Sequence, residues 1–294
     1  MSGREDGAPV TEGEVLRVEN VVVEYPGRGL RSVPFRALNG VSLDIRPGET
    51  VGLVGESGSG KTTLGRAILG LAAVQHGRIW FQGREIQDLR SRERRRLADR
   101  LQVVFQDPYT SLNPAMTVGA ILSEPLEVGG ASPHQARARI TQLLDQVGLP
   151  ADTVGRYPRE FSGGQRQRIA IARALARGPA LIVCDEPVSA LDLSTQATVL
   201  DLIIEIQQRT GVAYLFVSHD LQVVRHVSHR IAVMHGGEIV EQGSALAVTQ
   251  SPRHDYTRRL LLASPVSDPD AQRERRAERH RLLAAASTRS DGVR

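Results

Sequence analysis

The segment from Gly55 to Thr62 combines glycines, one lysine and one hydroxyl side chain at the spacing of a phosphate-binding loop. It reads Gly55-Glu56-Ser57-Gly58-Ser59-Gly60-Lys61-Thr62 and fits the pattern G-x-x-x-x-G-K-[ST], with Thr63 directly after it. The glycines let successive backbone N–H groups point at phosphate oxygens, and a following helix directs its positive end at the same anions. Lys61 can reach the β- and γ-phosphates, and the Thr62 hydroxyl can coordinate Mg²⁺. The sequence therefore predicts a site for ATP with Mg²⁺ at Gly55–Thr63.

Two adjacent carboxylates, Asp185 and Glu186, follow the apolar run Leu181–Cys184. In an open parallel sheet, ligands bind at the carboxyl ends of the strands, which is where these two side chains would stand. One carboxylate can hold Mg²⁺, mostly through water, and its neighbour can polarise the attacking water. Alone, an apolar strand that ends in two acids is usually only a strand end. Beside a phosphate-binding loop the pair favours ATP hydrolysis, with one carboxylate at the metal and its neighbour at the water.

Strands and helices alternate along the chain. The apolar patterns predict strands at Leu16–Tyr25, Val41–Ile45, Glu49–Val54, Ile79–Phe81, Leu101–Phe105, Ala180–Cys184 and Ala213–Val217. Helical patterns cover Lys61–Leu71, Ser91–Arg100, Gly163–Ala176, Asp192–Arg209 and Asp220–His226. A hairpin is predicted where Gly236-Gly237 joins Arg230–His235 to Glu238–Glu241. This alternation predicts an α/β fold with a mainly parallel core sheet.

The chain divides into an N-terminal segment, one large domain and a C-terminal extension. Residues 1–13 carry Gly, Pro, Ser and charges without an apolar period, so we expect them to be disordered. Residues 14–250 are expected to form the ATPase domain. Within it, the proline-punctuated stretch 107–160 is interpreted as an inserted helical subdomain, helical from about Ser132 to Val147. Residues 251–294 form the extension, whose Arg-rich tail is either a solvated helix or disordered.

The composition is that of an ordinary soluble protein. Of the 294 residues, 40% are hydrophobic and 24% are charged, and no run approaches the roughly 18 apolar residues of a membrane helix. The polar start Met1–Glu14 lacks the apolar core of a signal peptide, so we expect a cytoplasmic chain whose membrane work needs a partner. The single cysteine, Cys184, excludes an internal disulfide and a cysteine-built zinc or iron–sulfur site.

The positive charge of the chain comes from arginine. The net charge is +4, and Lys61 is the only lysine. Arginine richness can indicate nucleic-acid binding, but biased composition and a solvated surface are the interpretation we adopt. We therefore expect no nucleic-acid partner.

Five further segments narrow the class of phosphate-loop protein. Phe161-Ser162-Gly163-Gly164-Gln165 resembles the signature motif of the ATP-binding cassette (ABC) ATPases and precedes the Asp185-Glu186 strand, as in that family. The other resemblances are Gln106 to the Q-loop glutamine, Ser189-Ala190-Leu191-Asp192 to the D-loop, His219 to the switch histidine and Tyr25 to the aromatic residue that stacks on adenine. Each has a structural alternative, such as strand packing for Tyr25 and helix capping for Ser162 and Asp192. Their shared order over residues 15–264 favours the resemblance.

The resemblance to ABC ATPases implies a fold and a mechanism. The fold is a phosphate-loop NTPase cassette with an N-terminal antiparallel β subdomain and an inserted helical subdomain beside the parallel sheet. Two cassettes pack head to tail, and each ATP lies between the phosphate loop of one and the signature segment, here Ser162–Gln165, of the other. Glu186 then orients or activates water and His219 contacts the γ-phosphate. Gln106 is implied as a catalytic and metal-binding residue, and Asp192 as part of the nucleotide site.

Longer matches resemble one subfamily, the ATPases of oligopeptide, dipeptide and nickel importers. They are Gly52–Lys61, Val104–Pro114, Glu124-Pro125-Leu126, Asp185–Asp192 and Ser251–Thr257. The last resembles a His-Pro-Tyr-Thr element that opens the subfamily's C-terminal extension, although Asp255 replaces the proline. The extension lacks the cysteines of many members, and Thr62 stands where serine is commoner. No iron–sulfur cluster is therefore expected.

The subfamily resemblance also implies partners and a location. These are a second, non-identical ABC ATPase subunit, two membrane permease subunits and, indirectly, an extracytoplasmic solute-binding protein. The chain would lie at the cytoplasmic face of the membrane, and Gln106–Pro114 would transmit the ATP state to the permease. Peptide is the leading substrate, while nickel, opines and sugars stay open.

Three alternatives from other classes remain. A soluble ABC ATPase of translation or DNA repair would carry two cassettes, a coiled coil or zinc modules, which this sequence lacks. A non-catalytic nucleotide-binding subunit would usually lose the carboxylate or the histidine that stand here at Glu186 and His219. A close relative serving carbon–phosphorus bond metabolism is best separated by the neighbouring genes.

Overall fold

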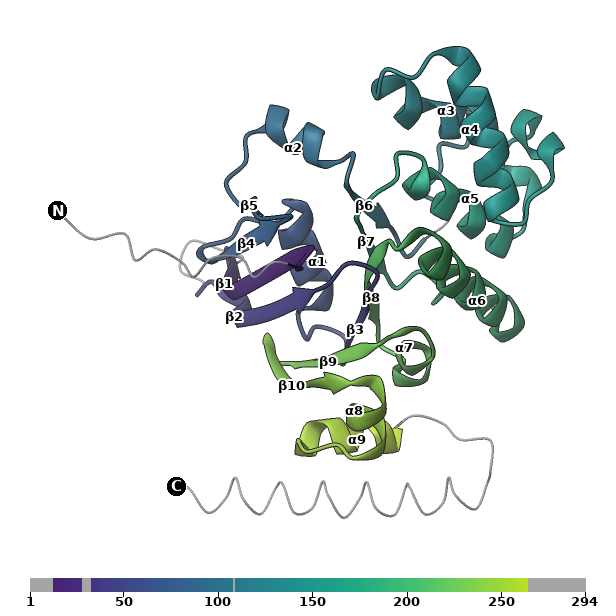
Figure 1. The fold of residues 1–294 in the computed structure, drawn as a ribbon. Coiled ribbons are helices and arrows are strands. Elements are labelled where there is room, and N and C mark those ends of the chain that lie inside the picture. Colours follow the sequence, from purple (N-terminus) through teal and green to yellow (C-terminus); the bar gives the residue numbers. More distant parts are fainter. Residues whose placement is uncertain (1–12, 28–32, 108, 264–294) are drawn as a thin grey trace, which may run out of the picture.

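The computed structural model describes residues 13–27, 33–107 and 109–263, which form two β-sheets with helices around the larger one (Figure 1). In the view of Figure 1, the smaller sheet lies at the left, the helices α3 and α4 lie at the upper right, and the C-terminal helices lie at the bottom. The predictions for residues 1–12 and for the Arg-rich tail fall outside the described residues.

The smaller sheet is antiparallel and has the strand order β2-β1-β4-β5. Its strands are β1 (Leu16–Tyr25), β2 (Phe35–Ile45), β4 (His76–Phe81) and β5 (Arg84–Glu85). Alternate residues of β1 point inward, so the sheet buries one face. The strand predicted at Val41–Ile45 begins six residues earlier, because Phe35 pairs with Tyr25 and extends the ladder.

The larger sheet is parallel except for one edge strand and has the order β10-β9-β3-β8-β7-β6. Its strands are β3 (Thr50–Val54), β6 (Leu101–Val104), β7 (Leu181–Asp185), β8 (Ala213–Ser218), β9 (Arg230–His235) and β10 (Glu238–Ser244). Every residue of β3 and β8 is buried, as expected for parallel strands covered on both faces. The predicted α/β fold with a mainly parallel core is confirmed.

Two apolar clusters lie on opposite faces of the parallel sheet. On β3, for example, Leu53 belongs to the cluster shared with the antiparallel sheet and α1 (Lys61–Leu69), whereas Val54 belongs to the cluster on the other face. That second cluster includes α5 (Gly163–Leu175), α6 (Leu193–Thr210) and α7 (Leu221–Val227). The alternation of side chains along each strand therefore ties the sheet to both layers.

The stretch between β6 and β7 contains most of the remaining helices. It comprises α3 (Val118–Val128), α4 (Pro133–Gln146) and the 3₁₀ helices η1 (Ala151–Gly155) and η2 (Pro158–Glu160). The predicted helix Ser132–Val147 corresponds to α4, which Ser132 caps. The sequence patterns did not reveal α3, because Pro125 lies inside it and proline normally interrupts a helix. Buried Ile121 and Leu122 pack this helix into the second cluster.

The described part of the chain ends in two short helices that fold back on the larger sheet. A charged helix, α2 (Ser91–Leu97), precedes β6, while α8 (Ala245–Gln250) and α9 (Asp255–Ala263) follow β10. The Glu241 carboxylate accepts hydrogen bonds from the backbone N–H groups of Arg253 and His254, at 2.8 and 3.0 Å, and so fixes the turn before α9. Across the described ranges, every helix is too short or too polar to span a membrane.

Candidate active site

The predicted phosphate loop and the predicted acidic pair lie at one edge of the parallel sheet. The loop follows β3, the acids end β7, and His219 follows β8. These strands are neighbours, with Val54 paired to Ser218 and Asp185 paired to Val217. The carboxyl ends of parallel strands meet at one edge, so the topology brings together segments more than 100 residues apart.

Glycine is required where the phosphate loop folds against its surroundings. Gly60 has a φ of 106°, and a Cβ there would lie 2.7 Å from the Ala37 carbonyl oxygen. At Gly55 an added Cβ would lie 2.2 Å from the carbonyl oxygen of Met234. These close approaches leave no room for a side chain at either position, so the loop can pass this close to its neighbours only with glycine there.

The Lys61 side chain folds back over its own loop. Only 5% of the residue is exposed, and Nζ donates to the carbonyl oxygens of Gly55 and Glu56 at 2.7 and 2.8 Å. Burial lowers the pKa of Lys61, and the nearby carboxylates of Glu186 and Asp185 oppose that shift. The ammonium group is thus held by oxygen acceptors that phosphate oxygens can replace.

The side chains of Thr62 and Asp185 meet beside the loop. The Thr62 hydroxyl donates to Oδ1 of Asp185 at 3.1 Å. Burial raises the pKa of Asp185, while the bond from Thr62 lowers it. A desolvated carboxylate next to a hydroxyl gives the hard oxygen ligands that Mg²⁺ prefers. In the described part of the chain, no group of three or more His, Cys, Asp or Glu side chains is placed to hold a metal ion.

Glu186 and His219 form a pair at the ends of β7 and β8. His219 Nδ1 lies 3.1 Å from Oε2 of Glu186. The Glu186 backbone has a φ of 50°, a left-handed conformation that costs a non-glycine residue energy. Its N–H donates to the Val217 carbonyl at 3.0 Å, and its carbonyl accepts from the Ser189 N–H and hydroxyl. These bonds fix the backbone that directs the carboxylate.

A cavity of about 210 Å³ opens over the loop. Its lining combines aromatic residues, loop residues and one acid: Tyr25, Phe35, Ala37, Ser57, Gly58, Gly60, Lys61, Thr62, Thr63 and Glu186. Sequence reasoning missed Phe35, because it began the second strand only at Val41, whereas β2 begins at Phe35. It is 61% exposed and pairs with Tyr25 across β1 and β2, so two aromatic rings border the cavity.

The signature segment Ser162–Gln165 lies beside the D-loop Ser189–Asp192 and the start of α6. Ser162 caps α5 reciprocally with Gln165, so the capping interpretation holds for its side chain. A Cβ on Gly164 would lie 2.2 Å from Cγ2 of Thr195, which shows how closely α5 approaches α6. Asp192 caps α6 and accepts from the Thr195 N–H at 3.0 Å. Hydrogen bonds from the Ser194 hydroxyl, the Thr195 hydroxyl and the Thr195 N–H lower the pKa of Asp192.

Gln106 follows β6 at the same sheet edge and is exposed. Two contacts connect the segment after it to α5. The Arg166 guanidinium lies 4.2 Å from the ring centroid of Tyr109, and Nη1 of Arg173 donates to the Ser111 carbonyl at 2.6 Å. The segment is therefore joined to the helix that begins with the signature residues.

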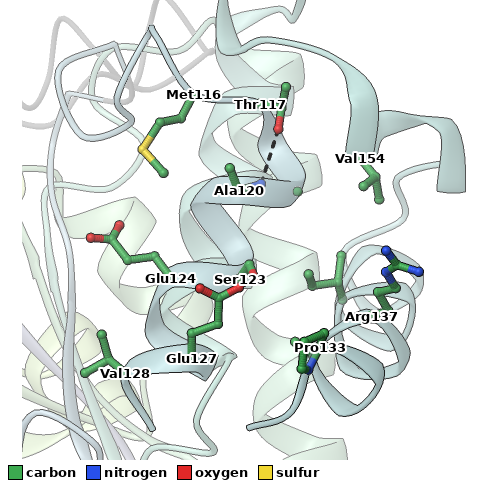
Figure 2. A pocket seen from close by; sticks show the side chains of 13 residues that line it. Met116, Thr117, Ala120, Ser123, Glu124, Glu127, Val128, Pro133, Arg137 and Val154 are labelled. Atoms are coloured by element: carbon green, nitrogen blue, oxygen red, sulfur yellow. Dashed lines mark hydrogen bonds between the residues drawn. The ribbon is translucent and has the colours of Figure 1, made fainter. Parts of the chain in front are cut away.

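A groove of about 600 Å³ lies on the helical insertion, between α3 and α4 (Figure 2). Met116, Ala120 and the two acids Glu124 and Glu127 line it from the α3 side, and Arg137 lies on α4. The groove therefore combines apolar surface with net negative charge.

Comparisons with known proteins agree with this geometry. A family model described as ABC transporter matches residues 38–189. The glutathione import ATP-binding protein GsiA of Shigella flexneri serotype 5b (strain 8401) is 51% identical over 91% of this chain and 44% of the relative. The protein of the same name from Escherichia coli (strain K12) is 50% identical over the same shares. The chain thus spans 44% of the length of these curated relatives.

Two solved structures resemble the chain along most of its length. The ATP-binding cassette MJ0796, in a dimeric post-hydrolysis state bound to ADP and phosphate, has a TM-score of 0.69 and 31% identity and covers 78% of this chain and 98% of its own. The structure of cbiO1 from Clostridium perfringens, part of the ABC transporter complex cbiONQ, has a TM-score of 0.72 and 27% identity. It covers 82% of this chain and 92% of its own.

Proposed function

Because this chain belongs to the ABC transporter family, we propose that it is the ATP-binding and ATP-hydrolysing subunit that drives an importer. The observation that carries the proposal is the convergence of three groups at one sheet edge. They are the phosphate loop with Lys61, the Thr62–Asp185 pair and the Glu186–His219 pair. Together they supply an anion cradle, oxygen ligands for Mg²⁺ and a carboxylate for water.

The binding step uses the loop and the two aromatic rings. Phosphate oxygens take the place of the Gly55 and Glu56 carbonyls on Lys61 and accept bonds from the loop N–H groups. Tyr25 and Phe35, which line the loop cavity, would stack on the adenine. Thr62 and Asp185, together with Gln106, would hold Mg²⁺, which neutralises phosphate charge when it is bound.

The hydrolytic step uses Glu186 and His219. The Glu186 carboxylate accepts a proton from a water whose oxygen forms a bond to the γ-phosphorus, while the bond from that phosphorus to the β–γ bridging oxygen breaks. His219 orients the carboxylate through the 3.1 Å contact and can donate to a γ-phosphate oxygen. ADP and phosphate leave, and the interactions made by the γ-phosphate are lost.

The signature segment supports a site shared between two subunits. Ser162–Gln165 begins α5 beside the D-loop, and the lining of the loop cavity in the described chain contains none of its residues. A second cassette packed head to tail would bring its own signature segment to the ATP. Such an arrangement makes ATP part of the interface between cassettes, and the partner is proposed to be a non-identical ABC ATPase.

The groove on the helical insertion is proposed to receive a short helix of a permease subunit. Its apolar floor and its acids Glu124 and Glu127 suit an amphipathic helix with basic residues. This docking places the chain at the cytoplasmic face of the membrane. The segment after Gln106 is joined to α5 through Arg166 and Arg173, so ATP-dependent movement can reach the signature helix.

A small peptide is the proposed cargo. The GsiA relatives are named for glutathione import, and glutathione is itself a small peptide. Nickel or another small solute remains the alternative. The test is to reconstitute the chain with its neighbouring permease, ATPase and binding-protein gene products in vesicles and to measure ATP hydrolysis. Stimulation by peptide-loaded binding protein is expected; a rate that no cargo changes would reject the transport role.

A further inference from the structure

The C-terminal extension reaches the phosphate loop through one tyrosine. The Tyr256 hydroxyl, at the start of α9, accepts a hydrogen bond from the Glu56 backbone N–H at 2.9 Å. The two residues are 200 positions apart in the sequence. Sequence reasoning placed Tyr256 in an extension beyond the ATPase domain and gave it no role at the nucleotide.

The peptide group that Tyr256 contacts is also the group that holds Lys61. The N–H of Glu56 and the carbonyl of Gly55 belong to one planar peptide unit. On the carbonyl side, Gly55 O accepts from Lys61 Nζ at 2.7 Å. A continuous path of two hydrogen bonds therefore runs from α9 through one peptide plane to the lysine ammonium.

Tyr256 itself is held in a fixed orientation. Only 2% of the residue is exposed, and its ring stacks on His235 with centroids 4.0 Å apart. Its backbone N–H donates to Nδ1 of His254 at 3.2 Å, in the turn that Glu241 fixes. Burial raises the pKa of Tyr256, so the hydroxyl keeps its proton throughout the neutral pH range. A rigid ring with a neutral hydroxyl is suited to fixing the orientation of a peptide plane.

We propose that Tyr256 is a positioning residue for the proposed ATP reaction: its hydroxyl sets the orientation of the Gly55–Glu56 peptide and, through it, the placement of Lys61. The inference rests on the proposed function, because Lys61 must exchange the Gly55 carbonyl for phosphate when ATP binds. During that exchange the carbonyl loses its lysine partner. The bond from Glu56 to Tyr256 then keeps the peptide plane, and hence the start of the loop, in its binding geometry.

The proposal separates ATP binding from the chemical step. Tyr256 acts on the loop that follows β3, whereas Glu186 and His219 stand at the ends of β7 and β8. Removing the hydroxyl is therefore expected to raise the KM for ATP and to leave kcat nearly unchanged. Loss of one hydrogen bond to a partly buried group predicts a rise in KM of roughly two- to tenfold.

The test compares Tyr256→Phe with the matched variant Tyr214→Phe. Tyr214 is 1% exposed on β8, and among the described residues its hydroxyl has no hydrogen-bond partner. Each substitution removes one buried tyrosine hydroxyl. Only Tyr256→Phe also removes a hydrogen bond to the phosphate loop. The first readout is the KM for ATP set against kcat in the assembled transporter. The second is the rate at which an amine reagent labels Lys61 without nucleotide, followed by peptide mass spectrometry.

The expected result is a higher KM and a several-fold change in Lys61 labelling for Tyr256→Phe, with Tyr214→Phe close to the unmodified protein. Equal KM and equal labelling in all three proteins would overturn the proposal, as would equal shifts in both variants. The labelling readout needs no ATP, so it still tests the Tyr256–Lys61 link if the unmodified protein fails to hydrolyse ATP. That failure would reject the proposed function instead.

Discussion

Glu186 Oε2 and His219 Nδ1 lie 3.1 Å apart at the ends of two adjacent parallel strands. The contact depends on the left-handed backbone of Glu186, whose φ is 50°. Such backbone strain persists only where surrounding hydrogen bonds impose it. At Glu186 these are the bonds that its backbone makes with the Val217 carbonyl and with Ser189. The carboxylate is thus directed at the histidine by the backbone as well as by the side-chain contact.

The first prediction concerns Glu186→Gln. The amide keeps the shape of the side chain but cannot accept the proton of the attacking water, so ATP should bind while turnover falls about 100-fold or more. Binding is measured by nucleotide retention and turnover by phosphate release in the assembled transporter. The matched control is Glu205→Gln on α6, whose carboxylate pairs with Arg209 at the surface. Turnover near the unmodified rate in Glu186→Gln would exclude this residue as the base.

The second prediction uses the only lysine of the chain. Burial lowers the pKa of Lys61, so the pH midpoint for amine labelling should lie below the ordinary value of 10.5. MgATP at about 100 times its Kd should slow labelling at least about tenfold, because few sites stay empty. AMP is the control, since it lacks the phosphates that Lys61 would contact. Labelling at the same rate with and without MgATP would count against the binding site.

The third prediction concerns the ion pair between Asp44 on β2 and Arg230 on β9. Two hydrogen bonds of 2.8 and 3.0 Å join the two sheets here. The bond from Arg230 is the main reason that the pKa of Asp44 lies below 3.8. A lowered folded-state pKa means that the stabilisation is complete above the unfolded value of 3.8 and is lost as the pH falls through the folded value.

Asp44→Asn should therefore lower the free energy of unfolding by about 1 kcal/mol near neutral pH, a value reduced for partial exposure. Urea titrations should show the difference from the unmodified protein constant above about pH 5 and shrinking as the pH falls below about 4. The exposed pair Arg209–Glu205 is the control, and Glu205→Gln should change stability by only a few tenths of a kcal/mol. A difference that stays constant with pH would contradict the assignment.

The fourth prediction concerns the groove between α3 and α4. Ala120→Trp places an indole in this groove, so it should weaken association with the permease by about tenfold or more. ATP affinity should be unchanged, because the groove does not overlap the loop cavity. Ala138→Trp, an exposed change on α4 outside the lining, is the control. Equal co-purification of the two variants with the permease would show that the partner docks elsewhere.

Much of the fold could be predicted because local patterns are strong in this sequence. The strand predicted at Leu16–Tyr25 agrees with β1 residue for residue, and the phosphate loop lies between a strand and a helix as its motif requires. The roles assigned to residues such as Gln106 and Asp192 remain predictions, although the structure gives their places at the sheet edge and at a helix start.

The features that sequence reasoning missed depend on tertiary contacts. Pro125 signals a break, yet burial of Ile121 and Leu122 outweighs its effect inside α3. The left-handed backbone of Glu186 is imposed by Val217 and Ser189 and has no local sequence signal. The contact between Tyr256 and Glu56 joins residues 200 positions apart, beyond the reach of any periodic pattern.

The single cysteine of the chain can report how often the central sheet opens. Cys184 lies 1% exposed on β7, next to Asp185, and burial raises the pKa of its thiol, so the folded sheet keeps it unreactive. A thiol reagent can modify it only in molecules whose central sheet has opened. The rate of Cys184 modification therefore measures how often the sheet opens at the strand that carries the acidic pair. A ligand that binds at the sheet edge and suppresses these openings should therefore slow the modification of Cys184. The effect can be measured without adding a label to the protein.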